Sequence, residues 1–357
     1  MEEAFRGGHR ELSEEPLREL REWRVVAHNR LRPDVVEIAV EPADGSTCPV
    51  HLPGSYFSLH LPVADGLVRC YGLVSAPGEA ALVFVVQGLP GGRGSQYLLR
   101  EVGVGSILRA PNPESLLVTP DWDAAPRTWW LVGGAMGTAT LLGLARGLLA
   151  PGRQPHRILF LAAHRSLRDV VLLDGLEALA AHDRVTLRHV LSDEVEEAGG
   201  GRWTPERLAE EVRSHWGQGI DRKDDVACVA GSPGLCAVVR DAWILLDLPT
   251  PRFEDHCAAP PGSPRPVAAI TVHQPDAPVW SFLSPGAGRG IWHEAIESGF
   301  DAPPPCRGSV CGQCEARLLR GTCQEGLWSQ PRGPEGPPIR LCRAHPVSPE
   351  VEVLRLR

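Results

Sequence analysis

Lysine is nearly missing from this sequence, and no run of basic side chains takes its place. Lys223 is the only lysine, and the 36 lysine and arginine residues are outnumbered by 44 aspartate and glutamate residues, which leaves a formal net charge of −8. Nucleic-acid-binding domains usually gather basic side chains in a patch or stripe. The charge pattern therefore predicts no nucleic acid among the partners of this protein.

Long apolar segments are missing as well. The longest, at 129–145, is shorter than the roughly 20 residues of a membrane-spanning helix and is interrupted by four glycines. The first residues, MEEAFRGGHRELSEEPLRELREW, are charged throughout and lack the apolar core of a secretory signal. We expect a cytoplasmic protein without a membrane segment.

The chain has 357 residues, more than one hydrophobic core usually organises, so we expect several domains. The pattern of apolar residues changes along the chain. From 23 to about 120, short β-rich runs such as VVEIAV and YFSLHL are separated by Gly, Pro and Asp turns, which predicts an antiparallel β-barrel. Farther on, strands and helices alternate in the pattern of a parallel α/β sheet. The strand-like runs lie at 129–132, 158–163, 185–191 and 226–230, and the helical segments at 138–149, 168–181, 205–216 and 234–246.

A Pro-rich stretch at 258–267 is typical of a linker. A strand-like run, a helix-like run and a cysteine cluster follow it. We therefore predict a multidomain chain, divided into an N-terminal arm at 1–22, the barrel at 23–122, the α/β domain at 123–257, the linker at 258–267 and a small cysteine domain at 268–357.

The spacing of the cysteines in the last domain predicts an iron–sulfur cluster. Cys306-x4-Cys311-x2-Cys314, followed by Cys342, matches the plant-type spacing that ligates a [2Fe–2S] cluster. A zinc site is the alternative, but zinc knuckles favour two C-x2-C pairs and this stretch contains one. Cys323 lies off the spacing and is expected to be a small buried side chain.

The order of these parts resembles the phthalate dioxygenase reductase and vanillate demethylase reductase family over 23–357. That family combines a flavin-binding barrel, a pyridine-nucleotide domain and an α+β ferredoxin domain of the β-grasp type. Two barrel motifs carry the resemblance: the family's R-x-Y-S strand resembles Arg69-Cys70-Tyr71-Gly72, and its G-R-G-S phosphate loop resembles Gly92-Arg93-Gly94-Ser95.

The resemblance implies that Tyr71 offers a flat face to the flavin ring and that Arg69 or Arg93 pairs with its phosphate, beside Gly94 and Ser95. Taken without it, an arginine and tyrosine on a strand are usually a surface pair, and GGRGS is usually a turn. Gly72 departs from the family, whose serine hydroxyl helps to orient the reactive edge of the flavin. We expect serine restored at this position to speed flavin reduction.

The middle domain departs further from the family. The family's glycine loop, GGIGITP, corresponds to 133–139, which includes Gly133, Gly134 and Thr138; Met136 replaces a glycine and is expected to crowd a pyrophosphate. The CGP turn corresponds to Ala230, Gly231, Ser232 and Pro233, so alanine replaces the cysteine near the nicotinamide. Arg165 is expected near the adenosine ribose, and Phe253 with Glu254 resembles the pair that ends the domain beside the flavin. The simpler alternatives are that Arg165 lies in an ordinary exposed loop and that Phe253 is an ordinary core residue.

A nicotinamide delivers two electrons together as hydride, whereas a [2Fe–2S] cluster accepts one at a time, so a flavin must stand between them. The resemblance thus implies an NAD(P)H-dependent reductase that passes single electrons to a partner oxygenase, expected to be of the Rieske non-haem iron type. Hydride transfer is expected around Tyr71, Gly72, Ala230 and Phe253. FMN is favoured over FAD because the GRGS loop resembles the FMN-containing group, and the choice of NADH or NADPH stays open.

Two rival functions remain. One is an FAD-containing reductase that serves a diiron or other oxygenase. The other is an electron-transfer or assembly subunit whose nicotinamide site has decayed, which Gly72, Met136 and Ala230 support.

Overall fold

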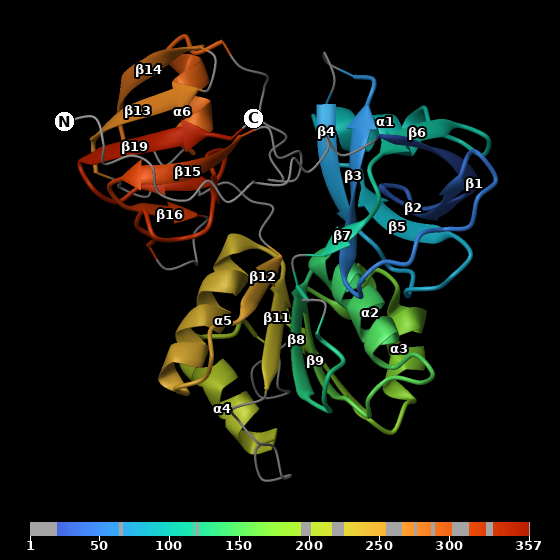
Figure 1. The fold of residues 1–357 in the computed structure, drawn as a ribbon. Helices are drawn as coiled ribbons and strands as arrows, with labels where there is room; N and C mark the ends of the chain where they lie inside the picture. The colour runs from blue at the N-terminus through green and yellow to red at the C-terminus, as the bar shows by residue number, and fades with distance from the viewer. Residues whose placement is uncertain are drawn as a thin grey trace.

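The computed structural model of the protein contains three sheets of five or more strands, which form three separate bodies in Figure 1. The residues it describes are 20–63, 67–115, 117–118, 121–193, 201–215, 225–254, 266–274, 277–286, 290–301, 314–325 and 331–356.

The first sheet is antiparallel throughout, as the short β-rich runs predict. Its path runs β4-β3-β6-β1-β2-β5, with β7 paired to β3. An isolated bridge from Leu73 to Phe84 joins the ends of this path, so the sheet curls into a barrel. Trp23 and Phe57 pack edge to face in its core, with ring centroids 4.8 Å apart. The strands are β1 (Arg21–Arg32), β2 (Val35–Pro42), β3 (Ser55–Leu61), β4 (Leu67–Gly72), β5 (Leu82–Gln87), β6 (Ile107–Ala110) and β7 (Glu114–Ser115), and helix α1 is Arg93–Arg100.

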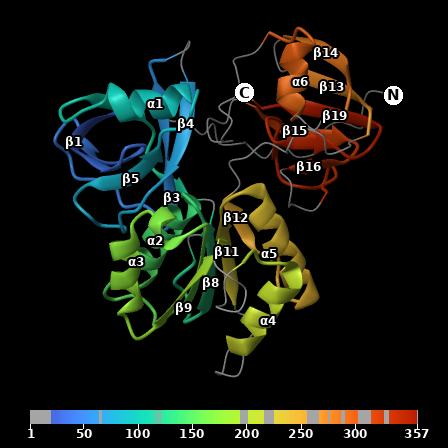
Figure 2. The ribbon, with the colours of Figure 1, turned by 180° about the vertical axis from the view of Figure 1, so that it is seen from behind.

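The second sheet is parallel in the order β10-β9-β8-β11-β12. Helices α2 and α3 cover one face and α4 and α5 the other, so central strands such as β8 are buried on both faces (Figure 2). The strands are β8 (Thr128–Gly134), β9 (Arg157–His164), β10 (Val185–Leu191), β11 (Val226–Ala230) and β12 (Arg252–Glu254). The helices are α2 (Gly137–Leu148), α3 (Leu173–Ala180), α4 (Pro205–His215) and α5 (Pro233–Leu245).

The helix predicted at 168–181 is wrong as a continuous element. A short 3-10 helix, Leu167–Asp169, and α3 take its place. Leu172, at the N-cap of α3, adopts a left-handed conformation with φ of 63°. One α-helix cannot continue through such a residue, because a left-handed backbone breaks the run of helical hydrogen bonds.

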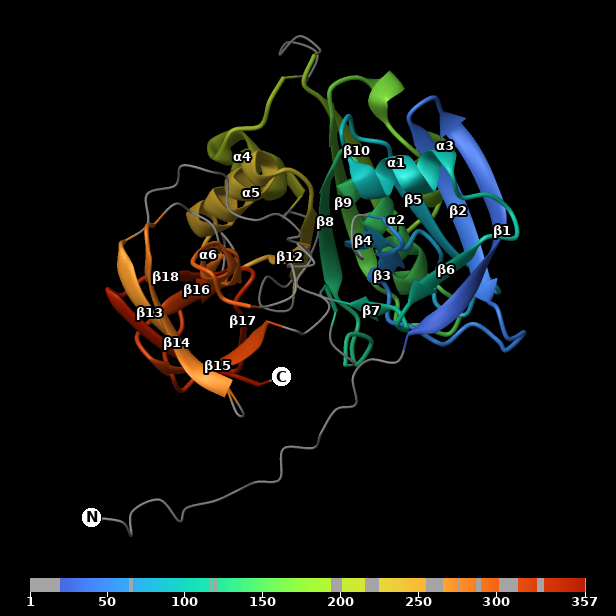
Figure 3. The ribbon, with the colours of Figure 1, turned by 90° about the horizontal axis from the view of Figure 1, so that it is seen from above.

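The third sheet is mixed, in the order β14-β13-β19-β15-β17, with β13 and β19 parallel. Helix α6 packs on it through the buried Trp292. Seen from above, this unit lies beside α5 and β12, whereas the barrel lies beside α2 and α3 (Figure 3). Its elements are β13 (Ala268–Gln274), β14 (Ala277–Ser284), α6 (Ile291–Glu297), β15 (Glu315–Arg320), β17 (Ile339–Arg340) and β19 (Glu350–Arg355), with a separate pair of β16 (Cys323–Glu325) and β18 (Ala344–Pro346).

Helix α2 joins the second sheet to the barrel through close backbone contacts. A Cβ built on Gly143 would lie 2.0 Å from the Leu73 carbonyl oxygen, and one on Gly147 would lie 2.7 Å from the Pro53 ring. Arg146 on the same helix donates to the Val74 carbonyl at 3.1 Å. Glycine thus lets α2 approach the barrel more closely than any other residue type would.

Within the described parts of the chain, every helix is too short or too polar to cross a membrane.

Candidate functional site

The two barrel motifs predicted from the sequence lie against each other. Gly94, in the first turn of α1, approaches β4 so closely that a Cβ on it would lie 3.2 Å from Arg69 Cγ and 3.0 Å from Leu61 Cδ1. Arg69 also donates to the Val68 carbonyl at 2.7 Å. The loop that begins α1 and the strand that carries Tyr71 therefore form one surface.

The start of α1 suits an anion. Among the described residues no side chain caps this helix, and its first turn contains no acidic residue. Ser95 Oγ instead donates to the Gly92 carbonyl and accepts from Leu89 N–H, both at 3.1 Å. Backbone N–H groups at such a helix start, with the exposed Arg93 beside them, are suited to a phosphate group.

Tyr71 presents a neutral aromatic ring next to this surface. Its ring lies 5.7 Å from that of Phe84, at an interplanar angle of 32°. Burial raises the pKa of the Tyr71 phenol, with the Arg69 charge acting in the opposite direction, so the phenol stays protonated. A flat, uncharged, partly buried ring is suited to stacking against a planar ligand.

Gly72, at the end of β4, touches the second sheet's helix α2. A Cβ built on Gly72 would lie 1.9 Å from Thr140 Oγ1 and 2.7 Å from Thr140 Cβ. Thr140 is 4% exposed, and its hydroxyl donates to Glu254 Oε1 at 3.3 Å. The place next to Tyr71 is therefore closed to a side chain on β4 and filled by a side chain from α2.

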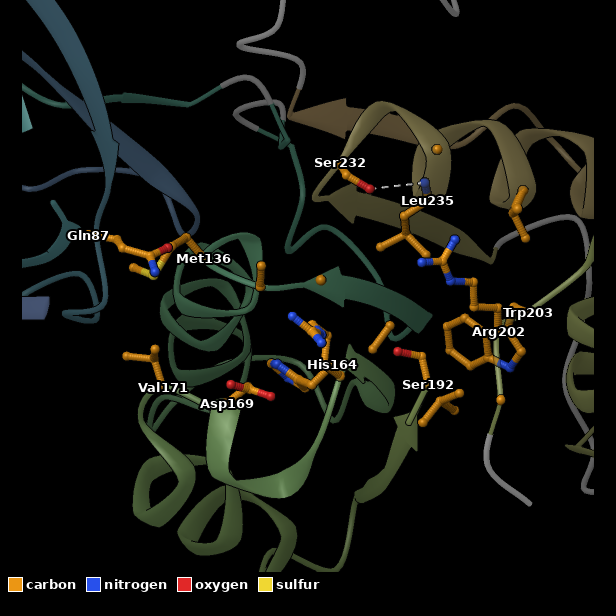
Figure 4. Close-up of a pocket in the computed structure, with 18 of the residues that line it drawn as sticks. Gln87, Met136, His164, Asp169, Val171, Ser192, Arg202, Trp203, Ser232 and Leu235 are labelled. Atoms are coloured by element: carbon orange, nitrogen blue, oxygen red, sulfur yellow. Dashed lines mark hydrogen bonds between the residues drawn. The ribbon is translucent and has the colours of Figure 1, made fainter. Parts of the chain in front are cut away.

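A pocket of about 640 Å³ opens at the carboxyl edge of the parallel sheet (Figure 4). It lies where the strand order reverses between β8 and β11, the usual ligand site of open α/β sheets. In Figure 4, Met136 and Gln87 lie at one end and Arg202 and Trp203 at the other, with His164 between them. The loops that follow β8, β9 and β11 all contribute to its wall, through Gly134, Ala135, Arg165, Ser232, Gly234 and Leu235.

Glycines hold the loops after β8 and β11 together. A Cβ on Gly137 would lie 2.3 Å from the carbonyl carbon and oxygen of Ala230, and one on Gly134 would lie 2.7 Å from Leu235 Cδ2. Gly133 packs against Thr138, and Gly231 against Leu235 and the backbone of Gly134. The glycine that this close approach requires is thus Gly137.

The backbone conformation at position 136 does not require a glycine. It has φ of −68°, an ordinary helical value, and its side chain packs partly on the core while lining the pocket. The substitution therefore leaves the backbone of the loop unstrained, and any effect of Met136 comes from its side chain in the pocket.

Three predicted residues, Ala230, Thr138 and Phe253, do not line the pocket. Ala230 is fully buried in the core under α2, and Thr138 is 1% exposed with its hydroxyl 3.5 Å from His164 Nε2. Phe253 is half-buried, pairs with Val229 and packs on the core beneath α4 and α5. Pro233 begins α5 after the N-cap Ser232, whose hydroxyl accepts from Leu235 N–H at 3.3 Å.

Arg165 does line the pocket, and its exposed guanidinium forms an ion pair with Asp193 at 3.6 Å. Sequence reasoning missed its neighbour His164, which is 7% exposed. Burial, aided by the nearby His189, lowers the pKa of His164 to about 4, so its imidazole is neutral near pH 7. A histidine at the carboxyl end of a predicted strand was the signal that could have revealed it.

Two of the four predicted cluster ligands lie within the described residues, and they lie close together. Leu341 N–H donates to the Cys314 carbonyl at 2.9 Å, and Leu341 directly precedes Cys342. Both cysteines are 3% exposed in the core of the third sheet. Cys306 and Cys311 lie outside the described residues.

Cys323 behaves as the spacing predicts. It is fully buried, pairs with Pro346 in the small β16–β18 sheet, and burial raises the pKa of its thiol to about 12. A thiol that stays protonated is a poor metal ligand.

Arg340, two residues before Cys342, lies near Tyr56 of the barrel. Burial by itself would lower the pKa of Arg340, but Tyr56 of β3 and the carboxylates of Glu325 and Glu315 raise it. Tyr56 in turn donates to Glu114 Oε2 at 3.0 Å.

Known proteins with similar sequences or structures include reductase components of oxygenase systems. No protein-family model matches the chain. A relative in Comamonas testosteroni, named putative toluene-4-sulfonate monooxygenase system reductase subunit TsaB2, is 28% identical over 316 residues, which cover 84% of this chain and 87% of the relative. In Mycobacterium tuberculosis, the 3-ketosteroid-9-alpha-monooxygenase ferredoxin reductase component is 26% identical over 322 residues, or 85% of each chain.

The solved structure of phthalate dioxygenase reductase superposes with a TM-score of 0.58 at 20% identity, and covers 94% of this chain and 97% of its own. The chain thus has a multidomain, sheet-rich fold like that of phthalate dioxygenase reductase. These sequence relatives are named as reductase components of oxygenase systems, the kind of protein that the motifs of this chain resemble.

Proposed function

We propose that the protein is an NAD(P)H-dependent reductase that passes single electrons from a hydride-reduced flavin, through a [2Fe–2S] cluster, to a partner oxygenase. The observation that carries the proposal is the arrangement of the three sheets. A phosphate-suited loop and Tyr71 lie on the barrel, a large pocket opens on the adjoining parallel sheet, and two buried cysteines lie together on the third.

The three sheets support the division into domains at 23–122, 123–257 and 268–357, with β1 beginning two residues earlier, at Arg21. The mixed five-stranded sheet with α6 on one side supports a ferredoxin domain of the β-grasp type for the last of these. The predicted arm at 1–22 and linker at 258–267 lie largely outside the described residues.

The barrel's residues fit an FMN. Arg69, Arg93, Gly94 and Ser95 would hold its phosphate at the start of α1, and Tyr71 would stack on its ring. When bound, the flavin accepts two electrons as hydride and returns them one at a time. FAD remains the alternative cofactor.

The pocket fits a pyridine nucleotide, NADH or NADPH. Gly133, Gly134 and Gly231 let the loops after β8 and β11 pack closely, and Gly134 lines the pocket where a pyrophosphate would bind. Arg165 would meet the adenosine end. Neutral His164 adds a polar group without a charge at the pocket's centre.

The third domain fits a [2Fe–2S] cluster on Cys306, Cys311, Cys314 and Cys342. Cys314, directly before β15, and Cys342, in the turn after β17, would supply two sulfur donors in a largely apolar core. Such a cluster accepts one electron at a time, so it suits a flavin on one side and an oxygenase, preferably of the Rieske type, on the other.

A carrier or assembly subunit with a decayed nicotinamide site is the second candidate. The full burial of Ala230 supports it, because this side chain offers no surface to a nicotinamide in the present arrangement.

An anaerobic titration separates the two. We expect either NADH or NADPH to bleach the flavin absorbance and then the cluster absorbance of the purified protein. Reduction by dithionite but by neither nucleotide would favour the carrier subunit.

A further inference from the structure

The contact between Gly72 and Thr140 has a consequence for the chemistry of the barrel. A Cβ at Gly72 would lie 1.9 Å from Thr140 Oγ1, far closer than non-bonded atoms approach. The volume that a side chain at position 72 would use is therefore already filled by the threonine hydroxyl of α2.

Thr140 is held in this place from two sides. Its hydroxyl donates to Glu254 Oε1 at 3.3 Å, and Glu254, at the end of β12, is itself only 8% exposed. Its helix is fixed against the barrel three residues later by the close contact of Gly143 with the Leu73 carbonyl. A buried hydroxyl with a buried carboxylate behind it has a defined orientation.

The position matters because Gly72 directly follows Tyr71, which the proposed function places against the flavin ring. We propose that Thr140, oriented by Glu254, is the hydroxyl that positions the reactive edge of the flavin, in place of a side chain on β4. This inference rests on the proposed function and adds a positioning residue from the nucleotide domain to the flavin site.

The direction of the hydrogen bond defines what Thr140 can do. Its single hydroxyl hydrogen points to Glu254, so Oγ1 is left as an acceptor. When a nicotinamide delivers hydride, its C–H bond breaks, the nicotinamide is oxidised, and a ring nitrogen of the flavin becomes an N–H donor. An acceptor beside that nitrogen stabilises the reduced flavin more than the oxidised one.

The decisive variant is Thr140→Val, which keeps the shape of the side chain and removes the hydroxyl. A typical hydrogen bond contributes about 0.5–1.5 kcal/mol, so we expect reduced flavin to bind about two- to tenfold more weakly. The midpoint potential of the flavin should move to a more negative value, and Thr140→Ser should keep the potential of the unaltered protein. Thr271→Val, which removes an exposed hydroxyl in the third sheet, is the matched control and should change neither quantity.

A transplant tests the same idea in the other direction. Gly72→Ser alone should weaken flavin binding, because the new Cβ overlaps Thr140. Gly72→Ser combined with Thr140→Gly should bind flavin better than either single variant, because the hydroxyl returns on β4 and no Cβ remains at position 140 to overlap the new side chain. Flavin affinity is measured by fluorescence titration with FMN and with FAD, and folding by the thermal midpoint.

If Thr140→Val and Thr140→Ser both match the unaltered protein in flavin affinity and midpoint potential, Thr140 serves only to pack α2 on the barrel and the inference is wrong. If the unaltered protein binds neither FMN nor FAD, the proposed function fails and the inference fails with it.

Discussion

At the scale of single residues, two glycines, Gly72 and Gly137, determine how closely neighbouring elements pack at this site. The serine expected to be beneficial at position 72 would collide with Thr140, so the simple rescue by Gly72→Ser is not supported by the structure. Likewise, the glycine that matters in the loop after β8 is Gly137, one position beyond the place where the family motif predicts it. In both places the departure from the family motif is matched by a neighbouring residue.

Gly137→Ala should be costly. The added Cβ would lie 2.3 Å from the backbone of Ala230, and backbone cannot give way as a flexible side chain can. Overpacking of this kind costs about 1–3 kcal/mol, and separating the two loops should also weaken nucleotide binding. The thermal midpoint and the Kd for NADH measure the two effects. Gly103→Ala is the control, because a Cβ there meets no atom within 4 Å, and equal results for both variants would contradict this reading.

Cys342→Ser should remove the iron and the acid-labile sulfide, since it takes away one of the four proposed ligands. Cys323→Ser is the matched control: it changes a buried cysteine in the same domain and should lower stability while keeping iron and sulfide. Iron and sulfide assays on both purified variants decide the point. Zinc bound to thiolates, with no acid-labile sulfide in the unaltered protein, would rule out the cluster.

At the scale of elements, α1 and β4 together form the surface that we propose binds the flavin. The helix is two turns long, and its first turn lies on β4 through Gly94. We therefore expect only the first turn of α1 to bind the flavin. Arg93, in this turn, should matter for binding, whereas Arg100, at the other end of the helix, should not.

Arg93→Ala should lower flavin affinity by about tenfold or more, because a charge-assisted hydrogen bond to phosphate contributes about 1.5–3 kcal/mol. Arg100→Ala, at the exposed far end of the same helix, is the control and should have little effect. Fluorescence titration gives the affinities, and the flavin released by acid identifies the cofactor. FAD in the extract would overturn the preference for FMN, and unchanged affinity in Arg93→Ala would remove this residue from the site.

At the scale of the whole molecule, the parallel-sheet domain contacts the barrel through α2, beside the proposed flavin site, and the third unit lies beside its α5 and β12. The buried His164 links the stability of this domain to pH. Because its pKa is about 4 in the folded protein and 6.5 in the reference state, the unfolded chain binds more protons between these values.

The stability that neutral His164 provides is therefore complete above about pH 6.5 and is lost as the pH falls toward 4, by at most about 3 kcal/mol. We expect His164→Asn to flatten the fall in the free energy of unfolding over this range, measured by denaturant titration at several pH values. His182→Gln, at a more exposed position, should leave the slope as it is. Equal slopes for His164→Asn and the unaltered protein would show that this imidazole is not the titrating group.

Much of this architecture follows from local pattern. The strands at 185–191 and 226–230 and the helix that begins at Pro205 after the N-cap Thr204 agree with β10, β11 and α4, because periodicity and capping act between residues close in the chain. The cysteine spacing and the barrel motifs are equally local. They were sufficient to predict the kind of relative that the chain has, the reductase components of oxygenase systems.

Only the tertiary structure decided the contacts between distant residues. Thr140 meets Gly72 across two domains, and His164 lies buried beside Thr138. The left-handed Leu172 divides a segment that looks continuously helical. Local patterns say nothing about such contacts, because they depend on how α2 packs on the barrel and how the loops meet at the edge of the sheet. Chain order therefore determined which chemistry this protein carries, and packing determined which residue supplies the hydroxyl beside Tyr71.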